Sequence, residues 1–299
     1  RGSWRRTIVQ AHRWFRFFPV HNASQLMTPD APRLQKWLAG LGYGSRRELE
    51  AWIREGRVVV NGEPAQLGQR VFERDRVVVD GKPVRGSNRG QRSRVLVMNK
   101  PAGVVCTRKD TQGRRTVYGD LPRLKSGRWI GIGRLDIQTA GLLLLTNDGA
   151  LAHKMMHPST GLDREYAVRV RGRLEDYALE VLREGVMIDS QLHRFSDVQY
   201  YDGRGHNHWY HVVLMEGKNR EVRRLFESVG VPVSRLKRVR YGPVLLPSRL
   251  AAGKVAELGY EDLKALYRLL KLPLNAIRDP GRNKQKSLLI PYPQLRSRS

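Results

Sequence analysis

Residues 85–94 contain no apolar side chain, and this short stretch divides the sequence into two parts. It consists of Arg, Gly, Ser, Asn and Gln, a composition typical of a flexible, positively charged linker. The segments on either side, 33–84 and 95–270, mix apolar and polar positions as globular domains do. The chain of 299 residues is also about twice as long as an ordinary domain. We therefore expect two domains joined by this linker.

The chain carries 55 Lys and Arg residues against 28 Asp and Glu residues, a formal net charge of +27. Such an excess costs self-repulsion unless a polyanion relieves it, and the phosphate backbone of nucleic acid is the commonest such partner. The alternative is a basic surface that is simply solvated. The hydrophobic fraction of 40% supports folded cores and excludes wholesale disorder.

Other classes of protein are excluded. Apolar runs such as Leu142–Leu145 are far shorter than the roughly 18 residues of a membrane-spanning helix. Cys106 is the sole cysteine, which excludes intrachain disulfides and multi-cysteine metal sites and favours a reducing cytoplasm. Two groups of histidines occur close together in the sequence: His153 with His157, and His206, His208 and His211. Neither group includes a cysteine or the glutamate of a zinc-protease motif, so we expect no metal site.

The two ends of the chain differ from the rest in composition. Residues 1–32 are basic and contain no acidic residue before Asp30. This extension is either an organelle transit peptide or a stretch that precedes the true start of translation at Met27. Residues 271–299 are basic and contain several prolines, so we expect a C-terminal tail that is disordered when free.

The segment 33–84 has the pattern of a small α/β module. Leu34, Trp37, Leu38 and Leu41 predict one apolar helix face. Ser45 and Glu48 have the spacing of a capping box, which predicts that a second helix starts there. Two valine strands follow at 58–60 and 77–79, with a hairpin turn at Asn61-Gly62 after the first.

Arg46 and Arg47 lie in the first turn of the second predicted helix, where the helix dipole disfavours cations by a few tenths of a kcal/mol. This position favours a phosphate partner, although both side chains can also extend into water. The order of helix, Gly turn, Ser-Arg-Arg, helix and Gly-Arg-Val-Val-Val-Asn-Gly resembles a small RNA-binding module first known from a small-subunit ribosomal protein. The same module occurs at the N-terminus of RNA-modifying enzymes.

In the longer segment, Asp136 stands out as a candidate catalytic residue. It follows Gly131-Ile132-Gly133-Arg134-Leu135, in a loop between two apolar, strand-like stretches. A loop held by a rigid scaffold is a favourable place for a reactive carboxylate. A surface aspartate that pairs with Arg134 would have the same pattern.

Two further segments carry candidate residues. In residues 164–171, one face carries Tyr166, Val168 and Val170, and the intervening residues form the other face, which predicts a strand with Tyr166 at one end of its buried face. The Tyr166 ring either stacks on a base or belongs to the core. Val222, Leu225 and Phe226 predict an apolar helix face that Arg223 borders, with Lys218 and Arg220 near the helix start. Residues 235–240 add a basic ribbon.

Together these segments resemble the pseudouridine synthase family, in the branch that carries the same N-terminal module. The matching motifs are Gly-Arg-Leu-Asp before Thr-x-Gly-Leu-Leu-Leu-Leu-Thr-Asn-Asp-Gly, then Arg-Glu-Tyr-x-Val-x-Val, then Asn-Arg-Glu-Val-Arg-Arg-Leu. The resemblance covers about residues 33–270. It implies an α+β fold: a small N-terminal RNA-binding module, and a catalytic domain with a mixed, mainly antiparallel sheet flanked by helices. It implies no metal and no organic cofactor.

The resemblance further implies that Asp136 is catalytic, that Tyr166 is the active-site tyrosine and that Arg223 pairs with the carboxylate. The implied substrate is a flipped uridine of large-subunit ribosomal RNA, single-stranded or in a hairpin loop. Asp136 would act in its ionised form, either as a nucleophile at C1′ or as a base at C2′. We expect a monomer. The residues expected to grip RNA are Arg46, Arg47, Arg54, Arg134, Lys218, Arg220, Arg224, Arg235, Lys237, Arg238 and Arg240.

Three alternatives remain open from the sequence. The chain could be a catalytically silent ribosome-assembly factor, or a pseudouridine synthase for another ribosomal RNA site. It could also be an Asp-dependent hydrolase of glycosidic bonds, which needs a second acid; Asp148 and Glu165 are the candidates.

Overall fold

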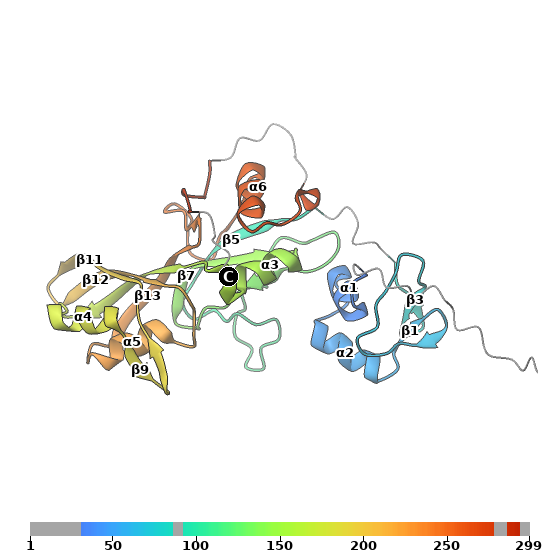
Figure 1. Cartoon of the computed structure of the whole chain (residues 1–299), viewed down its shortest axis with the longest axis horizontal. Helices are drawn as coiled ribbons and strands as arrows, with labels where there is room; N and C mark the ends of the chain where they lie inside the picture. The colour runs from blue at the N-terminus through green and yellow to red at the C-terminus, as the bar shows by residue number, and fades with distance from the viewer. Residues whose placement is uncertain (1–30, 86–91, 278–285, 294–299) are drawn as a thin grey trace, which may run out of the picture.

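The computed structural model describes residues 31–85, 92–277 and 286–293. Figure 1 shows a small N-terminal body that contains α1, α2, β1 and β3, and a larger body built around an extended sheet. Both bodies combine helices and strands, so the expected α+β class is confirmed. No helix in the described parts of the chain is both long and apolar enough to cross a membrane.

The N-terminal module consists of two helices packed on a four-stranded antiparallel sheet in the order β2-β1-β3-β4. Its elements are α1 (Leu34–Leu41), α2 (Arg46–Arg54), β1 (Val58–Val60), β2 (Glu63–Pro64), β3 (Val77–Val79) and β4 (Lys82–Pro83). The two predicted helices and the two predicted valine strands are therefore confirmed.

Local hydrogen bonds explain where these elements begin and turn. The Ser45 hydroxyl accepts a hydrogen bond from the Glu48 amide at 3.1 Å, and the Glu48 carboxylate accepts one from the Ser45 amide at 3.2 Å. This capping box satisfies two amides at the helix start. Asn61 and Gly62 have φ angles of 55° and 92°, and positive values at both positions are what a tight β-hairpin requires.

The larger domain contains a nine-stranded sheet in the order β11-β12-β8-β13-β7-β5-β15, with β14 paired to β13 and β6 paired to β7. Only the β13–β7 pair is parallel among the described strands, so the sheet is mixed and mainly antiparallel, as expected. The strands are β5 (Val95–Lys100), β6 (Ile130–Ile132), β7 (Thr139–Thr146), β8 (Arg164–Arg171), β11 (Asp197–Arg204), β12 (Asn207–Leu214), β13 (Val233–Tyr241), β14 (Val244–Leu245) and β15 (Val255–Glu257). A separate two-stranded ribbon is formed by β9 (Val186–Ile188) and β10 (Gln191–His193).

Two apolar cores lie on the two faces of this sheet. On β7, Leu143 and Leu145 belong to one core, while Leu142 and Leu144 belong to the other. Because the side chains of a strand alternate between its faces, this strand is buried on both sides. That explains why its apolar residues run without interruption, whereas β8 alternates as a strand buried mainly on one face does.

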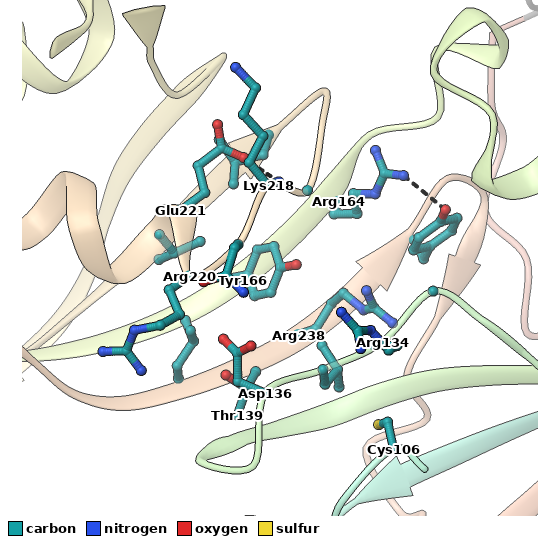
Figure 2. Close-up of a pocket in the computed structure, with 18 of the residues that line it drawn as sticks. Cys106, Arg134, Asp136, Thr139, Arg164, Tyr166, Lys218, Arg220, Glu221 and Arg238 are labelled. Atoms are coloured by element: carbon teal, nitrogen blue, oxygen red, sulfur yellow. Dashed lines mark hydrogen bonds between the residues drawn. The ribbon is translucent and has the colours of Figure 1, made fainter. Parts of the chain in front are cut away.

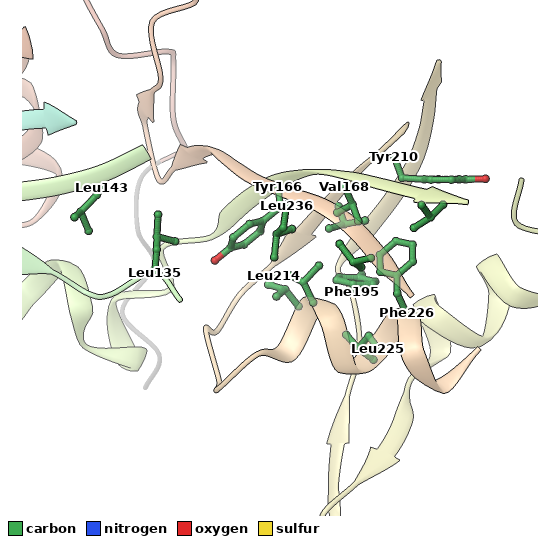
Figure 3. Close-up of a cluster of buried hydrophobic side chains, with 14 of the residues drawn as sticks. Leu135, Leu143, Tyr166, Val168, Phe195, Tyr210, Leu214, Leu225, Phe226 and Leu236 are labelled. Atoms are coloured by element: carbon green, nitrogen blue, oxygen red, sulfur yellow. The ribbon is translucent and has the colours of Figure 1, made fainter. Parts of the chain in front are cut away.

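Helices cover both cores. They are α3 (Gly149–Met156), α4 (Asp176–Glu184), α5 (Glu221–Ser228) and α6 (Tyr260–Leu269), with short 3-10 turns η1 (Pro158–Thr160) and η2 (Leu274–Ala276). Figure 3 shows Leu225 and Phe226 of α5 beneath the strands that carry Val168 and Leu236. Leu151 and Met155 of α3 are fully buried in the second core. The helices therefore clamp the strands that bear the candidate site residues.

The linker is shorter than expected. Residues 86–91 lie outside the described residues, but Ser93 and Arg94 belong to the larger domain. The Ser93 and Tyr267 hydroxyl groups form a hydrogen bond of 2.7 Å, and Arg94 forms an ion pair with Glu257 at 2.7 Å. The predicted boundary at residue 94 is corrected for this reason: these polar side chains find partners in the folded domain.

The expectation of a free C-terminal tail from residue 271 is wrong for the described stretches 271–277 and 286–293. Leu288, Leu289 and Tyr292 pack against the second core, and Leu289 forms a β-bridge with Val244. At the other end, residues 1–30 of the basic extension lie outside the described residues. The apolar residues between the C-terminal basic ones supply the burial that the composition alone did not suggest.

The C-terminal stretch reaches an internal ion-pair network. The Tyr292 hydroxyl donates to Asp163 at 2.7 Å, and Arg240 bonds Asp163 at 2.7 and 2.8 Å and Glu165 at 2.9 Å. Burial alone would raise the pKa of Asp163, but the hydrogen bonds from Arg240 and Tyr292 lower it below 3.8 overall. A carboxyl whose pKa is lowered by folding stabilises the protein above its unfolded-state pKa and loses this effect as the pH falls.

We predict that Asp163→Asn lowers the free energy of unfolding at pH 7 by about 3 kcal/mol, since it leaves Arg240 buried with fewer charged partners. The difference from the wild type should be complete above pH 3.8 and shrink below it. Urea unfolding at pH 7, 5 and 3 checks this. The control is Asp189→Asn, which removes the exposed partner of Arg224 and should change stability by less than about 1 kcal/mol. Equal effects of the two substitutions would contradict the prediction.

Candidate active site

The three candidate segments of the larger domain converge on one cavity of about 610 Å³. Asp136 lines it from the loop before β7, Thr139 from the first position of β7, Tyr166 from β8, and Lys218 from the loop before α5. Figure 2 shows the Asp136 carboxylate and the Tyr166 ring close together, while the Lys218 amine points away from them. The volume falls in the range of small-molecule sites and is sufficient for a single nucleoside.

Asp136 lies in the tight loop between β6 and β7. Its carbonyl oxygen accepts a hydrogen bond from the Thr139 amide at 3.0 Å, and Gly133 has a φ angle of 75°, which a residue with a side chain rarely adopts. The preceding residue, Leu135, is buried in the first core. The loop is thus fixed by the buried Leu135 and the turn at Gly133. The half-buried Asp136 carboxylate forms no hydrogen bond or ion pair with any described residue.

The loop is held from behind by Lys100, which sequence reasoning missed. Its side chain is fully buried, and its ammonium group donates to the carbonyl oxygens of Pro101, Ile137 and Thr139 at 2.9, 3.3 and 2.8 Å. Burial lowers the pKa of Lys100 from its ordinary value of 10.5, an effect that Cys106 and Asp136 oppose. The available signal was a lysine at the end of a strand that begins with the apolar run Val95–Met98.

Tyr166 forms a neighbouring wall of the cavity. It is 8% exposed and belongs to the first core through its position on β8. Figure 2 shows its ring beside the Asp136 carboxylate. The core and site readings of Tyr166 are therefore compatible: part of the ring is packed against Val168 and Leu236, and the rest faces the cavity.

Arg223 does not form the direct ion pair with Asp136 that was expected. It is 9% exposed, and its guanidinium donates to the carbonyl oxygens of Val233 at 3.0 Å and Gln138 at 3.2 Å. Burial lowers the pKa of Arg223, and the charge of Arg220 lowers it further, whereas Asp136 acts in the opposite direction. Arg223 thus holds the loop of Asp136 through its backbone and attracts the carboxylate at longer range.

The loop before α5 is ordered by a buried pair. Glu221 accepts a hydrogen bond from the Lys218 amide at 3.0 Å, and its other oxygen contacts His193 Nδ1 at 2.8 Å. His193 and Glu221 are 5% and 6% exposed. Arg220 has a φ angle of 50°, so the chain turns sharply just before the helix. This places Lys218 and Arg220 on the rim of the cavity.

The expected basic ribbon at 235–240 is divided by the alternation of β13. Arg235 and Lys237 are exposed, but Arg238 and Arg240 are 3% and 9% exposed. Arg240 is engaged by Asp163 and Glu165, so its expected phosphate contact is corrected to an internal ion pair. Arg238 donates to the Leu142 carbonyl oxygen at 2.8 Å and lines the cavity, and its Nη2 atom has no partner among the described residues.

The other predicted RNA-binding residues fall into three groups. Arg134 is exposed on the cavity rim. Arg224 is paired with Asp189 at 2.5 Å, which leaves it less available to a phosphate than expected. Arg46, Arg47 and Arg54 are exposed on α2 of the N-terminal module. Sequence reasoning also missed Arg164, which lines the cavity and donates to the Tyr241 hydroxyl at 2.9 Å.

No cluster of three or more His, Cys, Asp or Glu side chains suited to a metal ion occurs within residues 31–85, 92–277 and 286–293. The histidine groups have other contacts. His157 bonds Ser159 at 2.7 Å, and His211 bonds Glu165 at 2.7 Å. These imidazoles are therefore engaged in local hydrogen bonds, as ordinary structural histidines are.

Comparisons with known proteins agree with this architecture. The family model described as RNA pseudouridylate synthase matches residues 94–228, and that of the S4 domain matches residues 32–77. A crystal structure of a pseudouridylate synthase is similar, with a TM-score of 0.55 and 25% identity; the match covers 78% of this chain and 99% of that one.

Proteins named ribosomal large subunit pseudouridine synthase B are similar in sequence. The protein from Pseudomonas aeruginosa is 55% identical over 240 residues, which cover 80% of this chain and 62% of that protein. This chain thus spans less than two thirds of the Pseudomonas protein. The protein from Vibrio vulnificus is 50% identical over 244 residues, which cover 80% of this chain and 76% of that protein. At this identity and coverage, the chain belongs to the RNA pseudouridylate synthase family.

Proposed function

We propose that this chain is an isomerase that converts a uridine of large-subunit ribosomal RNA into pseudouridine in the cavity around Asp136. The observation that carries the proposal is an unengaged carboxylate beside Tyr166, in a nucleoside-sized cavity of a chain with a net charge of +27. The names of the similar proteins and the S4 match support an RNA substrate.

The reaction cuts the bond from ribose C1′ to uracil N1, turns the base and forms a bond from C1′ to C5. C5 loses a proton and N1 gains one, so the product is an isomer of uridine. A base stacked in a helix cannot turn, so the uridine is flipped into the cavity. Asp136 then attacks C1′ or removes the C2′ proton; its unpaired carboxylate suits either step. Tyr166 holds the base by stacking and assists proton loss from C5.

The positive charges around the cavity suit a polyanionic substrate. Arg134, Lys218 and Arg220 lie on the rim, where they contact backbone phosphates and position the strand rather than read its sequence. Further exposed cations are Arg235 and Lys237 on β13, and Arg46, Arg47 and Arg54 on α2. The uridine is single-stranded or in a hairpin loop, where flipping costs least. We further infer a cytoplasmic monomer that uses no metal.

Among the residues that the structure describes, the cavity has no second free acid for the hydrolase alternative. Asp148 caps α3 by accepting from Ala150 at 2.7 Å, and Glu165 is bound by Arg240 and His211. Glu221 lines the cavity but is engaged by His193. A glycosidase places two carboxyl groups about 5–10 Å apart on either side of the bond it cuts. The described carboxylates favour a mechanism with one acid, Asp136.

We predict that Asp136→Asn abolishes the reaction, with a rate loss of roughly a thousandfold or more, because the amide is neither a nucleophile nor a base. The measurement is tritium released from large-subunit ribosomal RNA transcribed with tritium at uridine C5. Asp202→Asn, an exposed aspartate on β11, is the matched control and should retain full activity. Sequencing of the modified position then identifies the uridine. Equal release by wild type and Asp136→Asn would refute the assignment, and a wild type that binds RNA without release would favour the assembly factor.

Tyr166→Phe should retain RNA binding, since the phenyl ring still stacks, but should slow tritium release by about a hundredfold if the hydroxyl assists proton loss. Tyr166→Leu should weaken productive binding as well, because the stacking surface is lost. Single-turnover tritium release over a range of enzyme concentrations separates the two effects. Identical rates for the phenylalanine variant and the wild type would show that the hydroxyl has no role in proton loss.

Lys100→Met should lower kcat by about tenfold to a hundredfold and leave KM for RNA nearly unchanged, because the loop that carries Asp136 loses its anchor while the RNA-binding rim stays intact. The control is Lys264→Met, an α6 lysine away from the cavity. A proportional rise in KM, or an unchanged kcat in a folded variant, would exclude a positioning role for Lys100.

A further inference from the structure

Positively charged side chains from both domains meet where the N-terminal module contacts the larger domain. Figure 1 shows α1 and α2 turned toward the larger domain, with β1 and β3 on the far side of the module. A cavity of about 280 Å³ lies at this contact, and Lys36, Arg46 and Arg128 line it together with the start of α3. We call this region the domain seam.

Three guanidinium groups lie close together at the domain seam. Arg46 comes from the first turn of α2, and a Cβ built on Gly149 would lie 4.0 Å from its Nη2 atom. Arg128 is half-buried, and its Nε atom is buried without a hydrogen-bond partner. Arg108 stacks on the Tyr118 ring at 4.3 Å and donates to the Trp129 carbonyl oxygen, next to Arg128 in the chain.

These charges act on one another. Burial lowers the pKa of Arg128, and the positive charges of Arg108 and Arg46 lower it further. Tyr118 and Glu48 act in the opposite direction. The arrangement therefore places the half-buried Arg128 near two exposed like charges, and an anion bound between them would relieve this repulsion.

The carboxylates at the domain seam are already engaged. Glu48 accepts from the Ser45 amide in the capping box and lies 3.9 Å from Lys109. Asp148 accepts from the amides that begin α3 and from the Tyr267 hydroxyl. Arg46 and Arg128 have no hydrogen bond or ion pair with any described residue. Their donors remain open to an incoming acceptor.

A phosphodiester fits this need, since its two free oxygens can each accept from a guanidinium fork. One segment of the chain contributes to both the candidate active site and the domain seam. Thr107 lines the active-site cavity, and the next residue, Arg108, belongs to the seam cluster. An RNA strand whose uridine enters the cavity can thus place one of its backbone phosphates at the domain seam.

On the basis of the function proposed above, we propose that a backbone phosphate of the RNA binds between Arg46 and Arg128 and bridges the two domains. The RNA then supplies the counter-charge that the seam lacks. Arg46 is a phosphate-binding residue at the seam in this proposal, and Arg128 is its partner on the larger domain.

The test measures binding of large-subunit ribosomal RNA transcript to chains that carry Asp136→Asn, so that no turnover occurs. Filter binding at several KCl concentrations gives Kd and its salt dependence for Arg46→Gln, Arg128→Gln and the double variant. Each single change should weaken binding several-fold and reduce the slope of log K against log salt by about one. The double variant should bind about as well as either single one, because both groups share one phosphate.

Two controls make the result specific. Arg268→Gln removes an exposed cation of α6 and should leave Kd unchanged. Arg128→Lys keeps the charge and should keep the salt slope, which separates a lost contact from a damaged fold. Single effects that add fully in the double variant, or an unchanged slope, would overturn the proposal. A second outcome would also overturn it. Inorganic phosphate would raise the melting temperature only when both Arg46 and Arg128 are present, while the arginine substitutions would leave the RNA Kd unchanged.

The proposed function is judged separately, by tritium release from the same transcript with the wild-type residue at 136. Release by the wild type together with unchanged RNA binding by the seam variants would refute the seam alone. Absence of release together with the predicted loss of binding would refute the isomerase and support the seam as an RNA contact.

Discussion

Two buried cations hold the loop on which the proposed chemistry depends. Lys100 donates to the carbonyl oxygens of residues 137 and 139, and Arg223 donates to the carbonyl oxygen of residue 138. Three consecutive carbonyl groups are thus fixed by charged donors, which form stronger hydrogen bonds than neutral ones. The Asp136 carboxylate stands directly before these carbonyls and needs no direct ion pair to be positioned. Both cations also attract it through space.

The distribution of acids explains why this carboxylate is free. Elsewhere in the described larger domain, buried or half-buried acids serve the fold: Asp163 and Glu165 hold Arg240, Glu221 holds His193, and Asp148 caps α3. By contrast, Arg134 on the cavity rim and Arg46 and Arg128 at the domain seam form no ion pair with any described residue. A surface with unpaired positive charges, and one unpaired carboxylate in its cavity, is suited to bind a polyanion such as RNA and to act on a single nucleotide.

The fold supports this arrangement by burying the strands around the site from both sides. β5 carries Lys100 at its end and β7 begins just after the loop of Asp136, and each contributes side chains to both apolar cores. The C-terminal stretch 286–293 adds a brace, because Tyr292 reaches the network that flanks Tyr166 on β8. Tyr166 therefore lies on a rigid strand, and the loop that carries Asp136 is held at both ends by strands of the same sheet.

Local patterns sufficed for much of this structure. The capping box at Ser45, the Asn61-Gly62 turn and the alternation around Tyr166 depend on residues close together in the chain, so the sequence by itself determined them, as it determined the motifs that indicate the family. Tertiary structure decided which cations face solvent and which are buried. Arg240 lies 75 and 77 residues from its partners, and Lys100 lies 37 and 39 residues from the carbonyls it binds. Local periodicity cannot predict such pairs, because they form only after the sheet has brought distant strands together.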